Sequence, residues 1–357
     1  MSSSPPSRRR QLLLWLASLL GAGLLLWLAS RRVTLWPTDF HLPRPDLLLA
    51  AIALHLPYSL TRSLRLRYAL DPRVRAATGD PRARLPRDLL HGSGLVSFFV
   101  ILLLPLRLGE LSRPLILTRA EVPGVGLPEA IAGAASERAV DGLFVVGLLL
   151  AGVARATSLG VEGAGAEAAA QVGRGMGLVF LALLAGLVVL AALPPRRLTR
   201  WTAALPERLG QFVRHFAATL RGLAAPATGL PLLAWSAVYW ALTVLQLWLV
   251  LHACGLPLGP AEAAAIVGIV GLSIQLPGGP AQVGSYQVGS VLALGLFVPA
   301  ADLAGPGSSF VAVSFLLGLV GAAVLALPGA WLLARAARRS TPPTPPAGPD
   351  TGPSSES

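Results

Sequence analysis

Residues 104–114 read LPLRLGELSRP and place three charged side chains in one of the most apolar regions of the chain. Arg107, Glu110 and Arg113 are spaced three residues apart, so on a helix they share one face. A charge at the centre of a membrane-spanning helix costs about 2.5–3.5 kcal/mol on insertion scales. Such residues persist where they pair, line a cavity or meet a ligand. The stretch therefore predicts a site inside the membrane.

The same stretch also predicts a break in the helix. Pro105 and Pro114 stop a helix, and Gly109 between them permits a turn. Irregular backbone at membrane depth is tolerated only where protein buries it or where it lines a water-filled cavity. The break therefore strengthens the interpretation of the charged cluster as a functional site.

The composition defines the class of protein. Of 357 residues, 54% are hydrophobic and 13% charged, whereas soluble domains carry about 25% charged residues. We therefore expect an all-α polytopic membrane protein. The net charge of +12 comes from arginines beside apolar segments, a pattern typical of membrane orientation and not of nucleic-acid binding. The single cysteine, Cys254, excludes intramolecular disulfides and cysteine-based zinc sites, and neither a cofactor nor a metal is expected.

Nine apolar segments define a single membrane domain over residues 11–335. They cover residues 11–29, 46–61, 88–106, 129–153, 174–193, 230–253, 260–276, 286–301 and 309–334. A full span needs about 20 residues, so 260–276 and 286–301 are short. Residues 1–10 form a basic head, and residues 336–357 form a Pro- and Ser-rich tail that we expect to be disordered.

Arginine distribution predicts the topology. Eight arginines lie between residues 62 and 87 and six between 196 and 221, so both regions and both termini should be cytoplasmic. If every segment crossed the membrane, the second of these regions would lie outside. The conflict disappears if residues 88–119 enter from the cytoplasm and return, while 260–301 enter from outside and return. The result is six full spans with two opposed re-entrant hairpins, a transporter signature; the alternative is eight or nine simple spans.

A second charged cluster lies in the motif ASERAVDG, which contains Glu137, Arg138 and Asp141. Its net charge is opposite to that of the first cluster, so the two should attract each other. The expected contacts join Arg107 or Arg113 to Glu137 or Asp141. Two interpretations stay open: a binding site that changes partners during transport, or structural ion pairs that fasten one hairpin.

The second predicted break is LPGGPAQVGSYQ, residues 276–287. Prolines stop the helix here, and glycines permit close backbone approach. A helix starting near Ala281 would offer free N–H groups to an anion such as lipid phosphate. The alternative is an ordinary loop between two spans. The candidate site residues at this break are Gln275, Pro277, Gly278, Gly279, Gly284, Ser285 and Tyr286.

In this order along the chain, LPLRLGELSRP, ERAVD and LPGGPAQVG resemble the transmembrane domain of lysylphosphatidylglycerol synthase/flippases. They equally resemble the stand-alone flippase-like membrane proteins related to that domain. The resemblance implies a bacterial inner-membrane location and movement of a lipid between leaflets. It also implies that the following residues belong to the core motifs of the family: Arg107, Gly109, Glu110, Arg113, Glu137, Arg138, Asp141, Pro277, Gly278 and Gly279.

The chain departs from the bifunctional members of that family in one respect. Those members continue into a soluble domain that transfers lysine from lysyl-tRNA to phosphatidylglycerol, whereas this sequence ends at Ser357 after its Pro-rich tail. We therefore expect no synthase activity and no enzyme. The leading hypothesis is a flippase for an anionic phospholipid or lipid-linked headgroup. The alternatives are a non-catalytic membrane partner of a lipid-modifying enzyme or glycosyltransferase, and a membrane-embedded enzyme acting on a lipid.

Overall fold

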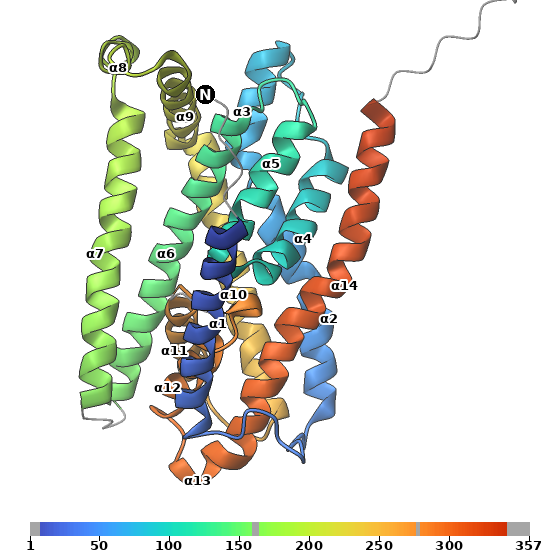
Figure 1. The fold of residues 1–357 in the computed structure, drawn as a ribbon, viewed down its shortest axis with the longest axis vertical. Coiled ribbons are helices and arrows are strands. Elements are labelled where there is room, and N and C mark those ends of the chain that lie inside the picture. The colour runs from blue at the N-terminus through green and yellow to red at the C-terminus, as the bar shows by residue number, and fades with distance from the viewer. Residues whose placement is uncertain (1–7, 159–163, 276–278, 341–357) are drawn as a thin grey trace, which may run out of the picture.

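The computed structural model describes residues 8–158, 164–275 and 279–340, without the side chains of some residues in these ranges. Within this part of the chain the regular elements are helices and no strand occurs (Figure 1). The all-α prediction is therefore confirmed. Helix α14 continues to Ser340, and the membrane domain over residues 11–335 stays a prediction.

Six long helices follow six of the predicted apolar segments. They are α1 (Arg8–Ser30), α2 (Pro45–Leu64), α6 (Leu127–Ser158), α7 (Ala164–Ala192), α10 (Pro226–Ala253) and α14 (Ser308–Ser340) (Figure 1). By length and hydropathy, three described helices can cross a membrane: Pro45–Leu64, Pro226–Ala253 and Ala300–Arg339. A fourth is added if Leu181–Ala192 and Pro195–Thr202, bent by 104°, count as one span. This supports a multi-pass membrane protein, and the count of six full spans stays a prediction.

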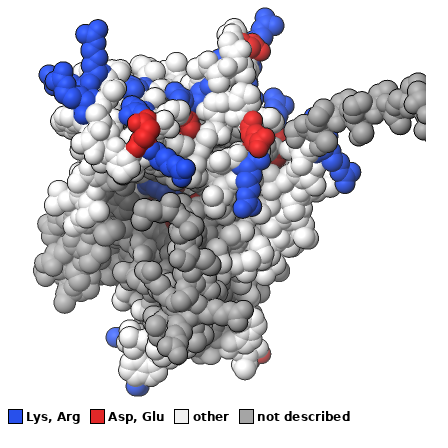
Figure 2. All heavy atoms as spheres, turned by 45° about the horizontal axis from the view of Figure 1, so that its top comes forward, with Lys and Arg blue, Asp and Glu red and all other residues white. Residues whose placement is uncertain are grey.

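One end of the molecule carries short helices that the apolar pattern does not predict. They are α3 (Arg67–Thr78), α8 (Pro195–Thr202) and α9 (Glu207–Ala224), and the C-terminal end of α14 reaches the same end. Figure 2 shows arginine side chains gathered here, so we call it the arginine-rich end. Glu129 joins α6 to α9 and α3 at this end, since its carboxylate lies 2.7 Å from His215 of α9 and 3.4 Å from Arg73 of α3.

The first hairpin lies at this end. Helix α4 (Arg87–Leu103) runs away from it, the 3₁₀ helix η1 (Pro105–Leu111) makes the turn, and α5 (Ser112–Arg119) returns (Figure 1). The turn is tight because Gly109 lies against the backbone of α4, where an added Cβ would collide with the carbonyl of Val100. The predicted break near Pro105–Gly109 is therefore present.

The second hairpin lies toward the opposite end. Helix α11 (Pro260–Ser273) runs inward, the 3₁₀ turn η2 (Pro280–Gln282) follows the break, and α12 (Ser285–Leu294) returns (Figure 1). A Cβ at Gly289 would collide with the hydroxyl of Ser273, so the two helices lie in close contact. The turns η1 and η2 contact each other, which brings the two breaks together inside the molecule.

The long helices hold the hairpins through small residues and an apolar core. Gly92 of α4 lies against the backbone of Gly329 of α14, and Gly268 of α11 lies against that of Leu149 of α6. Small residues let membrane helices approach closely enough for extensive van der Waals contact. The largest core cluster joins α10, α11, α12 and α14, so both arms of the second hairpin pack on long helices. The short helix α13 (Ala300–Asp302) and the π turn η3 (Leu303–Gly307) lead into α14.

Candidate functional site

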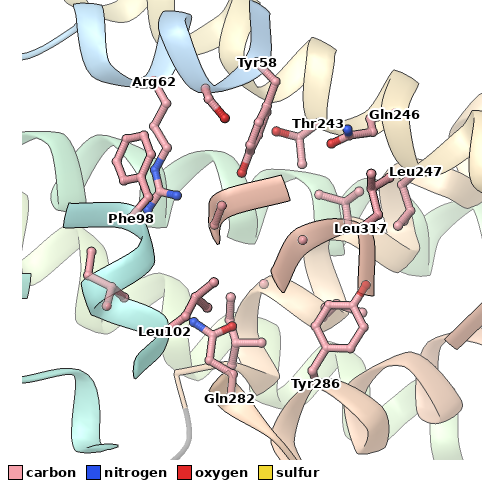
Figure 3. A pocket seen from close by; sticks show the side chains of 18 of the residues that line it. Tyr58, Arg62, Phe98, Leu102, Thr243, Gln246, Leu247, Gln282, Tyr286 and Leu317 are labelled. Atoms are coloured by element: carbon pink, nitrogen blue, oxygen red, sulfur yellow. The ribbon is translucent and has the colours of Figure 1, made fainter. Parts of the chain in front are cut away.

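A cavity of about 660 Å³ is lined by residues of both hairpins. Helices α2, α4, α6, α10, α11 and α14 form its wall together with η1, η2 and the start of α12 (Figure 3). This volume lies within the range of about 300–1,000 Å³ that is typical of ligand pockets. The two breaks, which are far apart in sequence, therefore contribute to one cavity.

Arg62, in the last turn of α2, faces this cavity (Figure 3). Its guanidinium carbon lies 3.8 Å from the centre of the Phe98 ring on α4, a favourable cation–π distance. Arg62 forms no ion pair and no hydrogen bond with any residue that the structure describes. Because Phe98 carries no formal charge, the positive charge of Arg62 is available to a ligand.

Asp141 of α6 also lines the cavity, but its carboxylate is already bonded. Arg65, which is 1% exposed, donates to both oxygens at 2.5 and 3.1 Å. The Nε1 of Trp240 donates to the same carboxylate at 3.1 Å. Arg65 in turn donates to the Ser236 hydroxyl at 3.0 Å and lies 4.4 Å from the centre of the Tyr239 ring. These contacts join α2, α6 and α10 beside the cavity.

Arg138 links the first break to α6. Its Nε lies 3.5 Å from the Glu110 carboxylate on η1, and its Nη1 lies 4.0 Å from Asp141. About a third of each side chain in the Arg138–Glu110 pair is exposed, at 36% and 30%. All three residues line the cavity. The Arg138–Glu110 pair is therefore more accessible than the Arg65–Asp141 pair, and easier for a ligand to separate.

Arg113 is buried away from the cavity. It is 6% exposed and pairs with Glu137 at 3.4 Å, one of the contacts expected between the two clusters. It also donates to the carbonyls of Ser63 at 2.5 Å and Leu90 at 3.4 Å. Neither Arg113 nor Glu137 belongs to the cavity wall. The pair fastens α5 to α2, α4 and α6. The side chain of Arg107 lies outside the described residues.

The second break contributes only part of the predicted set to the cavity. Gln275 and Tyr286 line it. Gly279 and Gly284 lie instead against Ala22 of α1, and the Ser285 hydroxyl donates to the carbonyl of Gln282 at 3.0 Å. Pro277 and Gly278 lie outside the described residues.

The predicted helix start near Ala281 needs a correction. Helix α12 begins at Ser285 instead, because Ala281 and Gln282 adopt left-handed backbone conformations with φ of +59°. The N–H of Gly284 donates to the Gln287 side chain at 2.7 Å, so an N–H group at this helix start is bonded within the chain. Gln282 was not predicted as a site residue, yet it lines the cavity.

The apolar pattern placed Arg62 and Arg65 after the end of the second segment, at residue 61. The segment contains no helix breaker after Pro57, so α2 continues to Leu64 with Arg62 in its last turn, and Arg65 directly after it is 1% exposed. A signal for the cavity face exists in the sequence. His55, Tyr58, Ser59 and Arg62 recur at i, i+3, i+4 and i+7 and all line the cavity.

The fold and the site define a polytopic helical membrane protein whose interior cavity holds charged side chains. The sequence matches the family model of the lysylphosphatidylglycerol synthase TM region over residues 14–321, and the chain belongs to this family. The resemblance seen in its motifs is thereby confirmed, and the family indicates a role connected with membrane lipids. No curated protein and no solved structure gives a significant match to the chain.

Proposed function

We propose that the protein is a flippase, which moves the headgroup of an anionic phospholipid or another lipid-linked anionic headgroup between leaflets of a bacterial inner membrane. In this proposal the lipid crosses unchanged, so the protein is not an enzyme. A lipid-modifying enzyme or a glycosyltransferase that makes or uses the lipid is the partner that such a role implies.

The proposal includes the topology of six full spans and two opposed re-entrant hairpins. The positive-inside rule makes the arginine-rich end, which includes the C-terminal end of α14, cytoplasmic, and we propose that both termini are cytoplasmic too. The hairpin α4–η1–α5 would then enter from the cytoplasm and α11–η2–α12 from outside. Broken helices that meet near the middle of the membrane are the usual site of substrate binding in secondary transporters. The contact between η1 and η2 supports this arrangement.

The observation that carries the proposal is the charge balance around the cavity. The described ionic side chains of the two clusters and of the end of α2 are Arg62, Arg65, Arg113, Arg138, Glu110, Glu137 and Asp141. Each carboxylate has an arginine partner, and Arg62 is the arginine without a carboxylate. A phosphodiester of charge −1 would neutralise this surplus, and charges at membrane depth are stable only when compensated.

The Arg138–Glu110 pair provides a means of coupling binding to movement. A phosphate bound at Arg62 would also attract Arg138 across the cavity wall. Loss of the 3.5 Å contact with Glu110 would remove an ion pair that joins η1 to α6 and let this turn shift, while Arg113 still holds α5 to α6. The membrane potential contributes about 2.3 kcal/mol per elementary charge at 100 mV, which suffices to bias the direction of an anionic lipid.

Lipid translocation in proteoliposomes tests the proposal. The purified protein is reconstituted with labelled phosphatidylglycerol, and the fraction reaching the opposite leaflet is followed over time. We expect Arg62→Gln to lower the rate at least tenfold, because an uncharged amide cannot neutralise the phosphate. Arg44→Gln is the matched control: Arg44 is an exposed arginine paired with Asp46 at 2.8 Å, outside the cavity.

Two outcomes would contradict the proposal. Translocation no faster than in empty liposomes, with folded wild-type protein, would favour the non-catalytic membrane partner. Chemical conversion of the lipid without a change of leaflet would identify an enzyme.

A further inference from the structure

Neutral polar side chains surround the part of the cavity that Arg62 does not occupy. Figure 3 shows Thr243 and Gln246 on α10, and Gln282 and Tyr286 after the second break, directed toward the same space as Arg62. The full set of neutral hydroxyl and amide side chains in the cavity wall is Tyr58, Ser59, Tyr239, Thr243, Gln246, Gln275, Gln282, Tyr286 and Ser314. The wall is thus rich in groups that both donate and accept hydrogen bonds.

Several of these groups keep hydrogen-bonding capacity toward the cavity. The amide nitrogen of Gln246 donates to the Ala51 carbonyl at 2.8 Å, and no described residue donates to its oxygen. The Thr243 hydroxyl donates to the Tyr239 carbonyl at 2.8 Å and can still accept. The side chain of Gln282 forms no hydrogen bond with a described residue. Thr243, Gln246 and Gln282 are half-buried at the cavity wall, so their remaining donors and acceptors can bind water or a polar ligand.

The backbone at Gln282 supports a role in binding. Positive φ is uncommon for residues other than glycine, and two consecutive cases, Ala281 and Gln282, are costly. Strained backbone of this kind clusters at ligand sites, where it fixes a side chain in place. Here it places the Gln282 amide in the cavity wall across from Arg62 (Figure 3).

The carboxylates of the cavity wall are not available to an amine headgroup. Asp141 is bonded to Arg65 and Trp240, and Glu110 is paired with Arg138. An ammonium group would have to displace an arginine from one of them and would then face the uncompensated charge of Arg62. A hydroxyl group carries no charge, so it would neither displace an arginine nor be repelled by Arg62. The cavity wall therefore favours hydroxyl headgroups over amine headgroups.

The size of the cavity favours a large headgroup. At about 30 Å³ per water molecule, a volume of about 660 Å³ holds on the order of twenty water-sized groups. A six-membered ring with several hydroxyls fills more of this space than an ethanolamine or glycerol headgroup and offers more hydroxyls to the polar side chains of the wall.

We infer that the transported headgroup is a phosphodiester carrying a ring-shaped polyol, a sugar or a cyclitol. The phosphate binds at Arg62, and the ring hydroxyls bind Thr243, Gln246 and Gln282. This inference rests on the proposed transport function and adds the substrate class to it.

Binding of short-chain lipids to the full-length protein in detergent, measured by native mass spectrometry, tests the inference. The probes are dioctanoyl phosphatidylinositol, phosphatidylethanol and phosphatidylethanolamine. The first two carry the same phosphodiester charge, and only the first has hydroxyls. Each net hydrogen bond contributes roughly threefold to tenfold in affinity. We therefore expect phosphatidylinositol to bind at least tenfold more tightly than phosphatidylethanol, and phosphatidylethanolamine to bind most weakly.

Two variants separate the hydroxyl sites from the phosphate site. Gln246→Leu and Gln282→Leu should each lower the preference for phosphatidylinositol over phosphatidylethanol by threefold or more. Arg62→Gln should weaken both lipids together and leave their ratio unchanged. Gln211→Leu is the matched control, because Gln211 lies on α9 outside the cavity.

Equal wild-type affinity for phosphatidylinositol and phosphatidylethanol would overturn the inference, and this comparison stands even if a variant fails to fold. Tightest binding of phosphatidylethanolamine would overturn it as well. The translocation assay tests the proposed function independently of the ligand class. Selective binding without translocation would contradict the proposed function and leave the ligand class intact. Translocation without selective binding would contradict the ligand class and leave the proposed function intact.

Discussion

Arg65 and Asp141 form the most enclosed ion pair beside the cavity, and their separation by 76 positions kept them apart in the sequence analysis. Burying a charge is costly unless a partner and hydrogen bonds compensate it, and here Ser236 accepts from Arg65 while Trp240 donates to Asp141. By contrast, the contact of Arg113 with Glu137 could be anticipated, because both lie in quoted motifs of opposite charge. The sequence alone could not show which of several arginines pairs with Asp141, because that depends on how α2 packs.

We predict that Arg65→Leu or Asp141→Leu alone strongly destabilises the protein. Each single change leaves a buried charge without its partner, a loss of about 3–5 kcal/mol in known cases. The double variant Arg65→Leu/Asp141→Leu removes both charges and should be more stable than either single variant. Thermal unfolding followed by size-exclusion chromatography in detergent measures this. Losses that simply add in the double variant would show that the two side chains do not interact.

At the scale of elements, the apolar pattern predicted the long helices well and the polar ones poorly. The nine predicted segments correspond to the six long helices and to three hairpin arms, α4, α11 and α12, because hydropathy reports which residues face lipid or core. The returning arm α5 lies outside them. Helices α3, α8 and α9 were not predicted, since they are short or polar and lie at the arginine-rich end. The breaks were found because proline and glycine act locally on the backbone.

We predict that Gly109→Ala disrupts the first hairpin. The added Cβ would collide with the Val100 carbonyl and the backbone of Ile101, so α4 and η1 would have to separate. Overpacking of this kind costs about 1–3 kcal/mol. Gly147→Ala on α6 is the control, because a Cβ there meets nothing within 4 Å. A lower unfolding temperature and slower translocation are expected for Gly109→Ala only; equal behaviour of the two variants would rule out the close contact.

At the scale of the whole molecule, some helices inside the structure carry charged residues, which lower the hydropathy of a segment. Helix α6 has 32 residues and carries Glu137, Arg138 and Asp141 between its apolar turns. The structure shows why these charges can lie inside: Arg113, Glu110 and Arg65 pair with them. The pairing was only partly predictable from sequence, because it requires knowing that the two hairpins approach the same cavity.

We predict that a cysteine at Thr118, on the returning arm of the first hairpin, is reached only from the cytoplasmic face. Thr118 lies near the end of α5, toward the arginine-rich end (Figure 1). The experiment uses a Cys254→Ala background, since Cys254 is the single native cysteine. A membrane-impermeant thiol reagent is added to one face of sealed vesicles at a time. Labelling from the external face would exclude a re-entrant first hairpin.

The most direct measurement of the central claim uses the same vesicles and a cysteine at Leu247, in the cavity wall (Figure 3). If the cavity opens alternately to each leaflet, Leu247→Cys reacts with impermeant reagent applied from either face, and anionic lipid slows both reactions. This is the result we predict. Reaction from one face only, with and without lipid, would contradict transport through this cavity.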